Sequence, residues 1–147
     1  MAVRGFPVRI DPSPSSGWWE TWQASLGGGA GRREALAALF DRVTPQRAFV
    51  TVSIDRTHAS VALGALDGRR LGIFNMATLP ALRRRGAGRT GLTALAGWAR
   101  ERGAEVGYLQ VELGNAPALE LYRTAGFAPA YHYVYLTRPA PEVTASA

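Results

Sequence analysis

The sequence predicts a single domain of the α/β (α+β) class, because segments with strand periodicity and segments with helix periodicity follow one another along the chain. Its 147 residues are the usual length of one domain, and 47% of them are hydrophobic, which is enough to build a core. The expected order is a strand, two helices, three strands, a helix, a strand, a helix, and one or two strands. We expect residues 1–138 to form the domain and residues 139–147, rich in Pro and Ala, to form a disordered tail.

The first elements are a strand and two helices. Apolar and polar residues alternate over residues 6–10, and a turn rich in Pro and Ser introduces a helix over about residues 17–25. Glycines at 27–31 break the chain before a second helix, about residues 32–40, which Pro45 closes. We expect that helix to bury three apolar residues, Leu36, Leu39 and Phe40.

The middle and the end of the chain predict more strands. Three of them are joined as hairpins, and the second turn is Asp67-Gly68, a dipeptide typical of tight turns. Further on, residues 106–111 form an apolar strand, and residues 131–136 form a last strand with tyrosines on one face and His132, Val134 and Leu136 on the other. The three hairpin strands cover residues 48–54, 59–66 and 70–78.

A loop rich in Arg and Gly, residues 83–88, lies between a strand that ends before Pro80 and an amphipathic helix. Small residues in the loop let the backbone approach a ligand, and the first amides of the helix have no partner inside it. Those amides, the helix dipole and three arginines together indicate a site for an anion. One face of the helix carries Leu92, Leu95, Ala96 and Ala99 at helical spacing.

Two common nucleotide-binding loops do not fit this segment. A Walker loop needs a Lys followed by Ser or Thr, and the chain contains no lysine. The dinucleotide fingerprint needs three spaced glycines and an acidic residue at the end of a second strand, and the nearest candidate, Glu105, comes at the end of the helix.

A second motif follows at residues 115–127, after the strand at 106–111. Asn115 can cap a short helix, and Pro117 falls in its first turn, where a missing N–H has no cost. Gly126 is placed where a left-handed residue would stop that helix. The helix would present Tyr122 from its last turns toward whatever the first loop binds.

Together the two motifs resemble those of the GNAT superfamily, the acyl-CoA-dependent N-acyltransferases. The spacing Arg-x-x-Gly-x-Gly is similar to the pyrophosphate loop of that family, and residues 115–127 are similar to its signature Asn-x-x-Ala-x-x-Leu-Tyr-x-x-x-Gly-Phe. The resemblance is strongest from Leu71 to Arg138 and only topological before. It implies the GNAT fold, a central mixed, mostly antiparallel sheet of six to seven strands flanked by four helices. The chain also resembles the C-terminal half of bacterial proteins with two such domains.

The resemblance implies an N-acetyltransferase that takes an acetyl group from acetyl-CoA, its cosubstrate, and transfers it to a primary amine by direct attack. Tyr122 would protonate the departing thiolate, and an amide beside the thioester carbonyl would polarise it. The residues implied to bind the cosubstrate are Met76 and Thr78 through their backbone, Arg83, Arg84, Arg85, Gly86, Ala87, Gly88 and Arg89 at the pyrophosphate, Asn115 at the pantetheine arm, and Tyr122.

The base that would deprotonate the amine is less well defined. Many relatives place a Glu on the strand before the loop, where this chain has Asn75. Glu112 is the best substitute, acting directly or through water, and it is equally well read as a solvated carboxylate at a strand end. Asp55 and His58 fall in a hairpin turn, where residues usually serve only as surface. A chain without a base would be a weak acyltransferase or a domain that binds acyl-CoA without turnover.

Three tryptophans in the first helix, Trp18, Trp19 and Trp22, border the acceptor site if the resemblance holds. Packing of the helix on the sheet accounts for two of them. Because adjacent residues of a helix point in different directions, we expect one of the three to be partly exposed and to touch substrate or a second subunit.

Composition weighs against other classes of function. The net charge of +6 comes from arginines alone, which suits polyanions and leaves an arginine-rich nucleic-acid binder as a further alternative, although the arginines are scattered in pairs. With no cysteines and two distant histidines, we expect no metal site. No apolar run reaches membrane-spanning length and no signal-peptide core is present, so we expect a cytoplasmic protein. Its expected partners are a small-molecule or peptide amine and, in a homodimer, a second copy.

Overall fold

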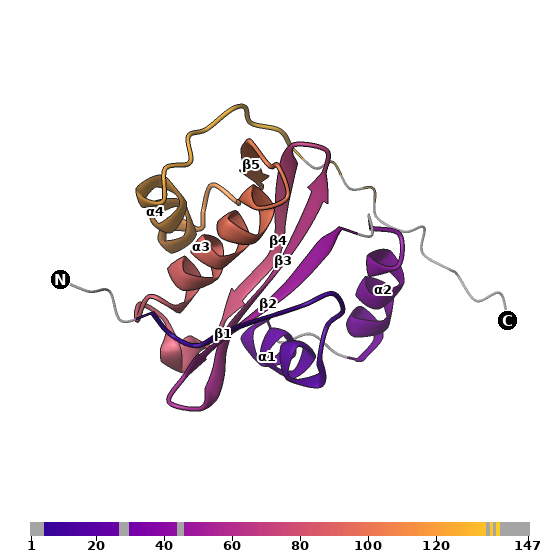
Figure 1. Cartoon of the computed structure of the whole chain (residues 1–147), viewed down its shortest axis with the longest axis vertical. Coiled ribbons are helices and arrows are strands. Elements are labelled where there is room, and N and C mark those ends of the chain that lie inside the picture. Colours follow the sequence, from indigo (N-terminus) through magenta and orange to yellow (C-terminus); the bar gives the residue numbers. More distant parts are fainter. Residues whose placement is uncertain (1–4, 27–29, 44–45, 135, 137, 139–147) are drawn as a thin grey trace, which may run out of the picture.

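The computed structural model describes residues 5–26, 30–43, 46–134, 136 and 138. It shows one five-stranded sheet with helices on both faces (Figure 1). Helices α1 and α2 cover one face, and α3 and α4 lie on the other. The elements are β1 (Val8–Asp11), α1 (Ser16–Leu26), α2 (Ala30–Phe40), β2 (Arg47–Ile54), β3 (Thr57–Asp67), β4 (Arg70–Thr78), η1 (Pro80–Leu82), α3 (Ala87–Arg100), β5 (Val106–Leu109) and α4 (Ala116–Thr124).

The sheet is mixed and mostly antiparallel, as predicted. Strands β1 to β4 pair with their neighbours in chain order, each antiparallel to the one before. Strand β5 pairs parallel to β4, and α3 makes the crossover that a parallel connection needs. The four helices are also confirmed, and the turn at Asp67-Gly68 has the positive φ of 58° at its glycine that a tight hairpin requires.

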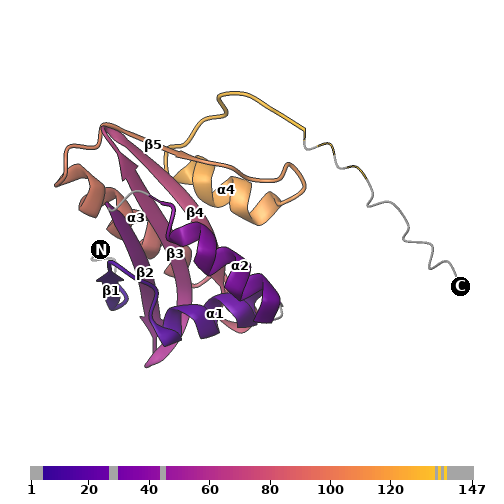
Figure 2. The ribbon, with the colours of Figure 1, turned by 90° about the vertical axis from the view of Figure 1, so that its right-hand side faces the viewer.

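The predicted count of six to seven strands is wrong for the described residues, which form five. The predicted strand at 131–136 is absent from its described residues, and β5 ends at Leu109 rather than at Val111. In this segment Tyr131 is 78% exposed and Val134 is 82% exposed, so neither face packs on the domain (Figure 2 shows the chain leading away from it). A strand persists only when its backbone groups and one face find partners, so alternation alone did not produce one. Residues 139–147, the expected tail, lie outside the described residues.

All three tryptophans of α1 are buried, so the expectation that one of them is exposed is wrong. Trp18, Trp19 and Trp22 are 0%, 5% and 2% exposed. The reason is that α1 is covered on two sides. The sheet lies beneath it, and from α2 Phe40 stacks on Trp19 at 5.5 Å between ring centroids while the guanidinium of Arg33 lies 5.1 Å from the same ring. A helix held between a sheet and a second helix buries a wider arc than one resting on a sheet alone.

Trp18 also supports an irregularity in the sheet. Its indole Nε1 donates to the carbonyl oxygen of Ala62 at 3.2 Å, in a fully buried position. Ala62 is the β3 residue at which the pairing with β4 shifts by one.

In α2, Phe40 is buried as predicted, whereas Leu39 is 57% exposed, contrary to prediction, because it points away from the tryptophans that bury Phe40.

Candidate functional site

The loop after β4 presents backbone amides at the start of α3. Gly86 is the N-cap with φ of 94°, and the first amide to donate to this end of the helix is that of Thr90, to the Gly86 carbonyl at 3.0 Å. The amides of Ala87, Gly88 and Arg89 therefore precede the intrahelical hydrogen bonds and are available to a ligand. A Cβ built on Gly86 would meet nothing closer than the Phe6 ring at 3.8 Å, so open space lies beside this backbone.

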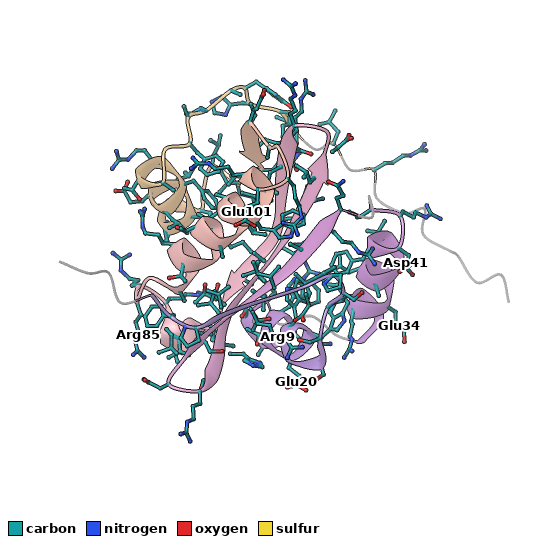
Figure 3. The ribbon with its side chains drawn as sticks, in the orientation of Figure 1. Arg9, Glu20, Glu34, Asp41, Arg85 and Glu101 are labelled. Atoms are coloured by element: carbon teal, nitrogen blue, oxygen red, sulfur yellow. The ribbon has the colours of Figure 1, made fainter. Side chains whose placement is uncertain are left out.

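The arginines of the loop are exposed, and two of them are held at its edges. Arg83 donates from Nε to the carbonyl oxygen of Thr78 at 3.2 Å. Arg85 pairs with Asp55 at 3.4 Å, which places it beside the tip of the β2–β3 hairpin (Figure 3). Arg89, one turn into α3, donates from Nη2 to the hydroxyl of Thr124 in α4. Positive charge thus surrounds the helix N-terminus without any strong ion pair to neutralise it.

Strands β4 and β5 separate a short way from this loop. Their last paired residues are Ile73 and Leu109, after which β4 continues to Thr78 beside β3 alone. The separation coincides with a bulge, because Asn75 and Met76 together stand opposite Ala62. Asn75 has a φ of 52°, an uncommon value for a residue other than glycine. The bulge turns the end of β4 away from β5.

The backbone of β4 beyond the bulge has one side that no strand pairs with. The amide of Leu79 donates to the Ala59 carbonyl at 2.8 Å, so this residue uses its backbone groups toward β3. Backbone groups alternate in direction along a strand, so those of Met76 and Thr78 point to the opposite side, where β5 no longer pairs. These are the two positions at which the sequence predicts pairing with the pantetheine arm, which stays a prediction, and the Thr78 carbonyl already accepts from Arg83.

Helix α4 begins and ends as the sequence predicts. The side-chain oxygen of Asn115 accepts the amide of Ala118 at 3.3 Å, Pro117 lies in the first turn, and Gly126 has a φ of 99°. Capping occupies the side-chain oxygen of Asn115 and leaves its amide nitrogen as the donor for a ligand.

Tyr122 of α4 reaches the divergence of the strands. Its hydroxyl lies 3.5 Å from the sulfur of Met76, and its ring packs edge to face against Phe127 with 6.1 Å between centroids. Burial raises the pKa of the Tyr122 hydroxyl, so it is protonated at neutral pH. Leu121 fixes the helix against α3, since a Cβ on Gly88 would lie 3.3 Å from its Cδ2 atom. The structure thus brings Tyr122, the free edge of β4 and the N-terminus of α3 together.

The candidate bases lie at the end of a strand and around a hairpin turn. Glu112 is exposed and follows the end of β5, and its carbonyl accepts the amide of Asn115 at 3.0 Å. Asp55 lies in the β2–β3 turn as predicted, whereas His58, predicted in the same turn, belongs to β3 and pairs with Ser53, because the strand begins two residues earlier than its alternation indicated. The first pairs with Arg85, and the imidazole of the second lies against Gly17 at the start of α1.

Two aromatic residues next to the divergence are not predicted by the sequence patterns. Phe74 and Tyr108 belong to β4 and β5, and their rings meet edge to face with 6.2 Å between centroids. Gly72 is the one hint in the sequence, because a glycine within a strand leaves room for large neighbouring side chains. The parallel register of β5 on β4 is still needed to place Tyr108 beside it.

Metal ligands and membrane-spanning helices are both absent from the described part of the chain. Its His, Asp and Glu residues form no cluster of three or more close enough to hold a metal ion. Among the described helices, none is both long and apolar enough to span a membrane.

Residues 17–127 match the family model described as the Acetyltransferase (GNAT) family. The chain is 28% identical over 131 residues, 88% of its length, to the uncharacterised N-acetyltransferase YobR of Bacillus subtilis (strain 168). It is 39% identical over 84 residues, 56% of its length, to streptothricin acetyltransferase of Streptomyces lavendulae. These matches cover 53% and 44% of the two relatives, so the chain spans about half the length of the curated relatives it matches.

The fold matches solved structures more completely. AAC(6')-Iy, in complex with the bisubstrate analogue CoA-S-monomethyl-acetylneamine, superposes with a TM-score of 0.70 over 91% of this chain and 99% of that one. The identity to it is 13%, so this likeness concerns the fold.

Proposed function

The chain belongs to the GNAT family of acetyltransferases, and from this premise we propose that it transfers an acetyl group from acetyl-CoA to a primary amine. The observation that supports this most directly is the position of Tyr122, whose hydroxyl lies 3.5 Å from Met76 where β4 leaves β5. Acetyl transfer from a thioester needs a proton donor, a strand edge that no other strand pairs with, and a helix N-terminus, all in one place.

The residues at the site fit coenzyme A. Its pyrophosphate would lie at the amides of Ala87, Gly88 and Arg89, where the open space beside Gly86 admits it and the exposed arginines add charge. The pantetheine arm would extend along β4, pairing with the backbone groups of Met76 and with the amide of Thr78, whose carbonyl accepts from Arg83. When bound, acetyl-CoA supplies an acetyl thioester, a carbonyl carbon already activated for attack by an amine.

In this proposal the residues of the chain handle two protons. The amine must lose a proton to attack, and Glu112 takes it directly or through water. A C–N bond then forms, the attacking nitrogen gives its second proton to water, and the C–S bond breaks. The Tyr122 hydroxyl gives its proton to the departing sulfur and recovers one from water. The amide of Met76 donates a hydrogen bond to the carbonyl oxygen, where negative charge develops.

We propose a small molecule as the acceptor. One relative is named a streptothricin acetyltransferase, and the solved structure above holds an analogue built from acetylneamine. The alternative is a domain that binds acyl-CoA without turnover. Asn75 favours that alternative, since β4 carries no carboxylate at the bulge, and the presence of Tyr122 opposes it.

We expect acetyl-CoA to raise the melting temperature of the protein. A ligand that binds only the folded state stabilises it by RT ln(1 + [L]/Kd), about 2.7 kcal/mol at a concentration of 100 Kd. Differential scanning fluorimetry with acetyl-CoA, CoA and ATP measures this, and ATP, which lacks the pantetheine arm, should act far less. No shift at millimolar acetyl-CoA would contradict the proposal.

Replacing Glu112 with Gln tests the base and distinguishes turnover from binding alone. We expect kcat/KM at neutral pH to fall by about a hundredfold, the lower end for general bases. Activity should recover at alkaline pH, where the amine has already lost its proton. Melting shifts with acetyl-CoA should match those of the unsubstituted protein. A Gln variant with an unchanged pH profile would show that Glu112 is only a solvated carboxylate.

A further inference from the structure

Phe74 and Tyr108 form an exposed aromatic pair on the face of the sheet opposite α3. Leu71 and Ile73 point into the core beneath α3, so the alternating residues Gly72 and Phe74 point to the other face. Tyr108 pairs with Gly72 across the parallel register and lies on that same face. Phe74 is 38% exposed and Tyr108 is 47% exposed. Among the described helices and strands they are the aromatic side chains most open to solvent.

The pair is held in a fixed arrangement. A Cβ on Gly72 would lie 2.6 Å from Cε2 of Phe74 and 2.8 Å from the hydroxyl oxygen of Tyr108, so the Phe74 ring and the Tyr108 hydroxyl lie directly over the glycine. Their planes meet at 86°, the edge-to-face geometry that aromatic pairs favour. The two rings therefore present a preformed surface, and little side-chain freedom remains to be lost when a ligand contacts it.

The aromatic pair lies next to the point where β4 and β5 separate. Phe74 is the first residue of β4 after the last pair with β5, Ile73 and Leu109. Met76, two residues on, packs with the α3 core and contacts Tyr122, so the proposed acid approaches from the α3 and α4 face. An acceptor that attacks from the opposite side of the gap passes over Phe74 and Tyr108.

The charge around the pair limits what can bind. Carboxylates of α1 and α2, namely Glu20, Glu34 and Asp41, lie far from β5 (Figure 3). The first acidic residue after β5 is Glu112, and the chain as a whole carries a net charge of +6. Glu105, directly before β5, already pairs with Arg69 at 2.9 Å. A molecule with several ammonium groups would therefore meet few available carboxylates and an unfavourable overall potential there. A single ammonium is attracted by the faces of aromatic rings, and an apolar ring packs on them.

We propose that Phe74 and Tyr108 are specificity-determining residues, and that they select a primary amine with one positive charge and an aromatic or apolar ring. This inference rests on the proposed acetyltransferase function and narrows its acceptor. It predicts preference for such amines over polycationic aminoglycosides, despite the substrates named for similar proteins.

The experiment compares 2-phenylethylamine with the polycation tobramycin. Calorimetric titration into protein saturated with CoA measures acceptor binding without turnover, and release of CoA from acetyl-CoA gives kcat and KM. In Phe74→Ala and Tyr108→Ala we expect the Kd and KM for 2-phenylethylamine to rise about threefold to thirtyfold, with kcat changing less than about twofold. Tyr108→Phe keeps the ring and should restore most of the affinity that Tyr108→Ala loses. Tyr131→Ala, which removes an exposed tyrosine elsewhere, should leave both values unchanged.

The outcomes separate this inference from the proposed function. If acetyl-CoA shifts the melting temperature but tobramycin binds more tightly than 2-phenylethylamine, or the alanine variants bind 2-phenylethylamine normally, the aromatic selection is wrong and the acetyltransferase proposal stands. Failure of 2-phenylethylamine to bind the CoA-saturated protein also overturns it. Absence of any melting shift with acetyl-CoA instead contradicts the proposed function itself.

Discussion

Replacing Tyr122 with Phe is expected to lower kcat by about 10²- to 10⁴-fold while the affinity for CoA stays nearly unchanged. The structure explains why stability should change little. The described partner of the hydroxyl is the sulfur of Met76 at 3.5 Å, and a thioether is a weak acceptor, so its loss costs little folding free energy. The ring contact with Phe127 remains in the variant. Steady-state kinetics, with urea unfolding beside it, measure both quantities.

Tyr131→Phe is the matched control, because it removes a hydroxyl from an exposed tyrosine outside the site. It should leave kcat unchanged. A Tyr122→Phe variant that unfolds more easily yet keeps its turnover would make Tyr122 a packing residue, with the leaving thiolate protonated by water.

The pH dependence of stability and of activity follows from the direction in which burial shifts the pKa of Tyr122. Burial raises the pKa of Tyr122 above its ordinary value in the unfolded chain, so the folded state holds this proton more tightly. The resulting contribution to stability is full below the unfolded pKa, about 10, and is lost as the pH rises through the folded value. We therefore expect activity to fall above about pH 10, because Tyr122 loses there the proton that it would donate.

The double substitution of Arg83 by Ala and Gly86 by Val is expected to weaken CoA binding by at least about a hundredfold. In the proposed complex Arg83 would give charge-assisted hydrogen bonds to the pyrophosphate, each of which is worth about 1.5 to 3 kcal/mol. A valine at 86 would fill the open space that the backbone presents to the phosphates, and its φ of 94° would strain the N-terminus of α3. Calorimetric titration with CoA measures the loss.

Gly103→Val is the control for backbone strain. Gly103 has a φ of 91° and open space around it, but it follows the C-terminal end of α3, far from the loop. It should lower the melting temperature to a similar degree and bind CoA normally. If the double variant is folded and binds CoA as tightly as Gly103→Val does, the phosphates lie elsewhere.

The sequence by itself determined the features that depend on neighbours along the chain. Capping of α4 by Asn115, its stop at Gly126 and the left-handed Gly86 before α3 are local, because the side chain or the absence of one acts within a few residues. The hairpin at Asp67-Gly68 and the order of helices and strands follow from local periodicity in the same way. These local features locate the candidate site, whose residue roles remain predictions.

Only the tertiary structure decided which surfaces meet. Trp19 is buried because α2 covers the side of α1 that the sheet does not reach, and periodicity within one helix carries no information about a second. The pairing of Phe74 with Tyr108 depends on the register between two strands separated by a whole helix. Residues 131–134 have the alternation of a strand and form none, because a strand exists only where another backbone offers the hydrogen bonds. Local sequence sets what a segment can become, and long-range packing selects which of those possibilities is realised.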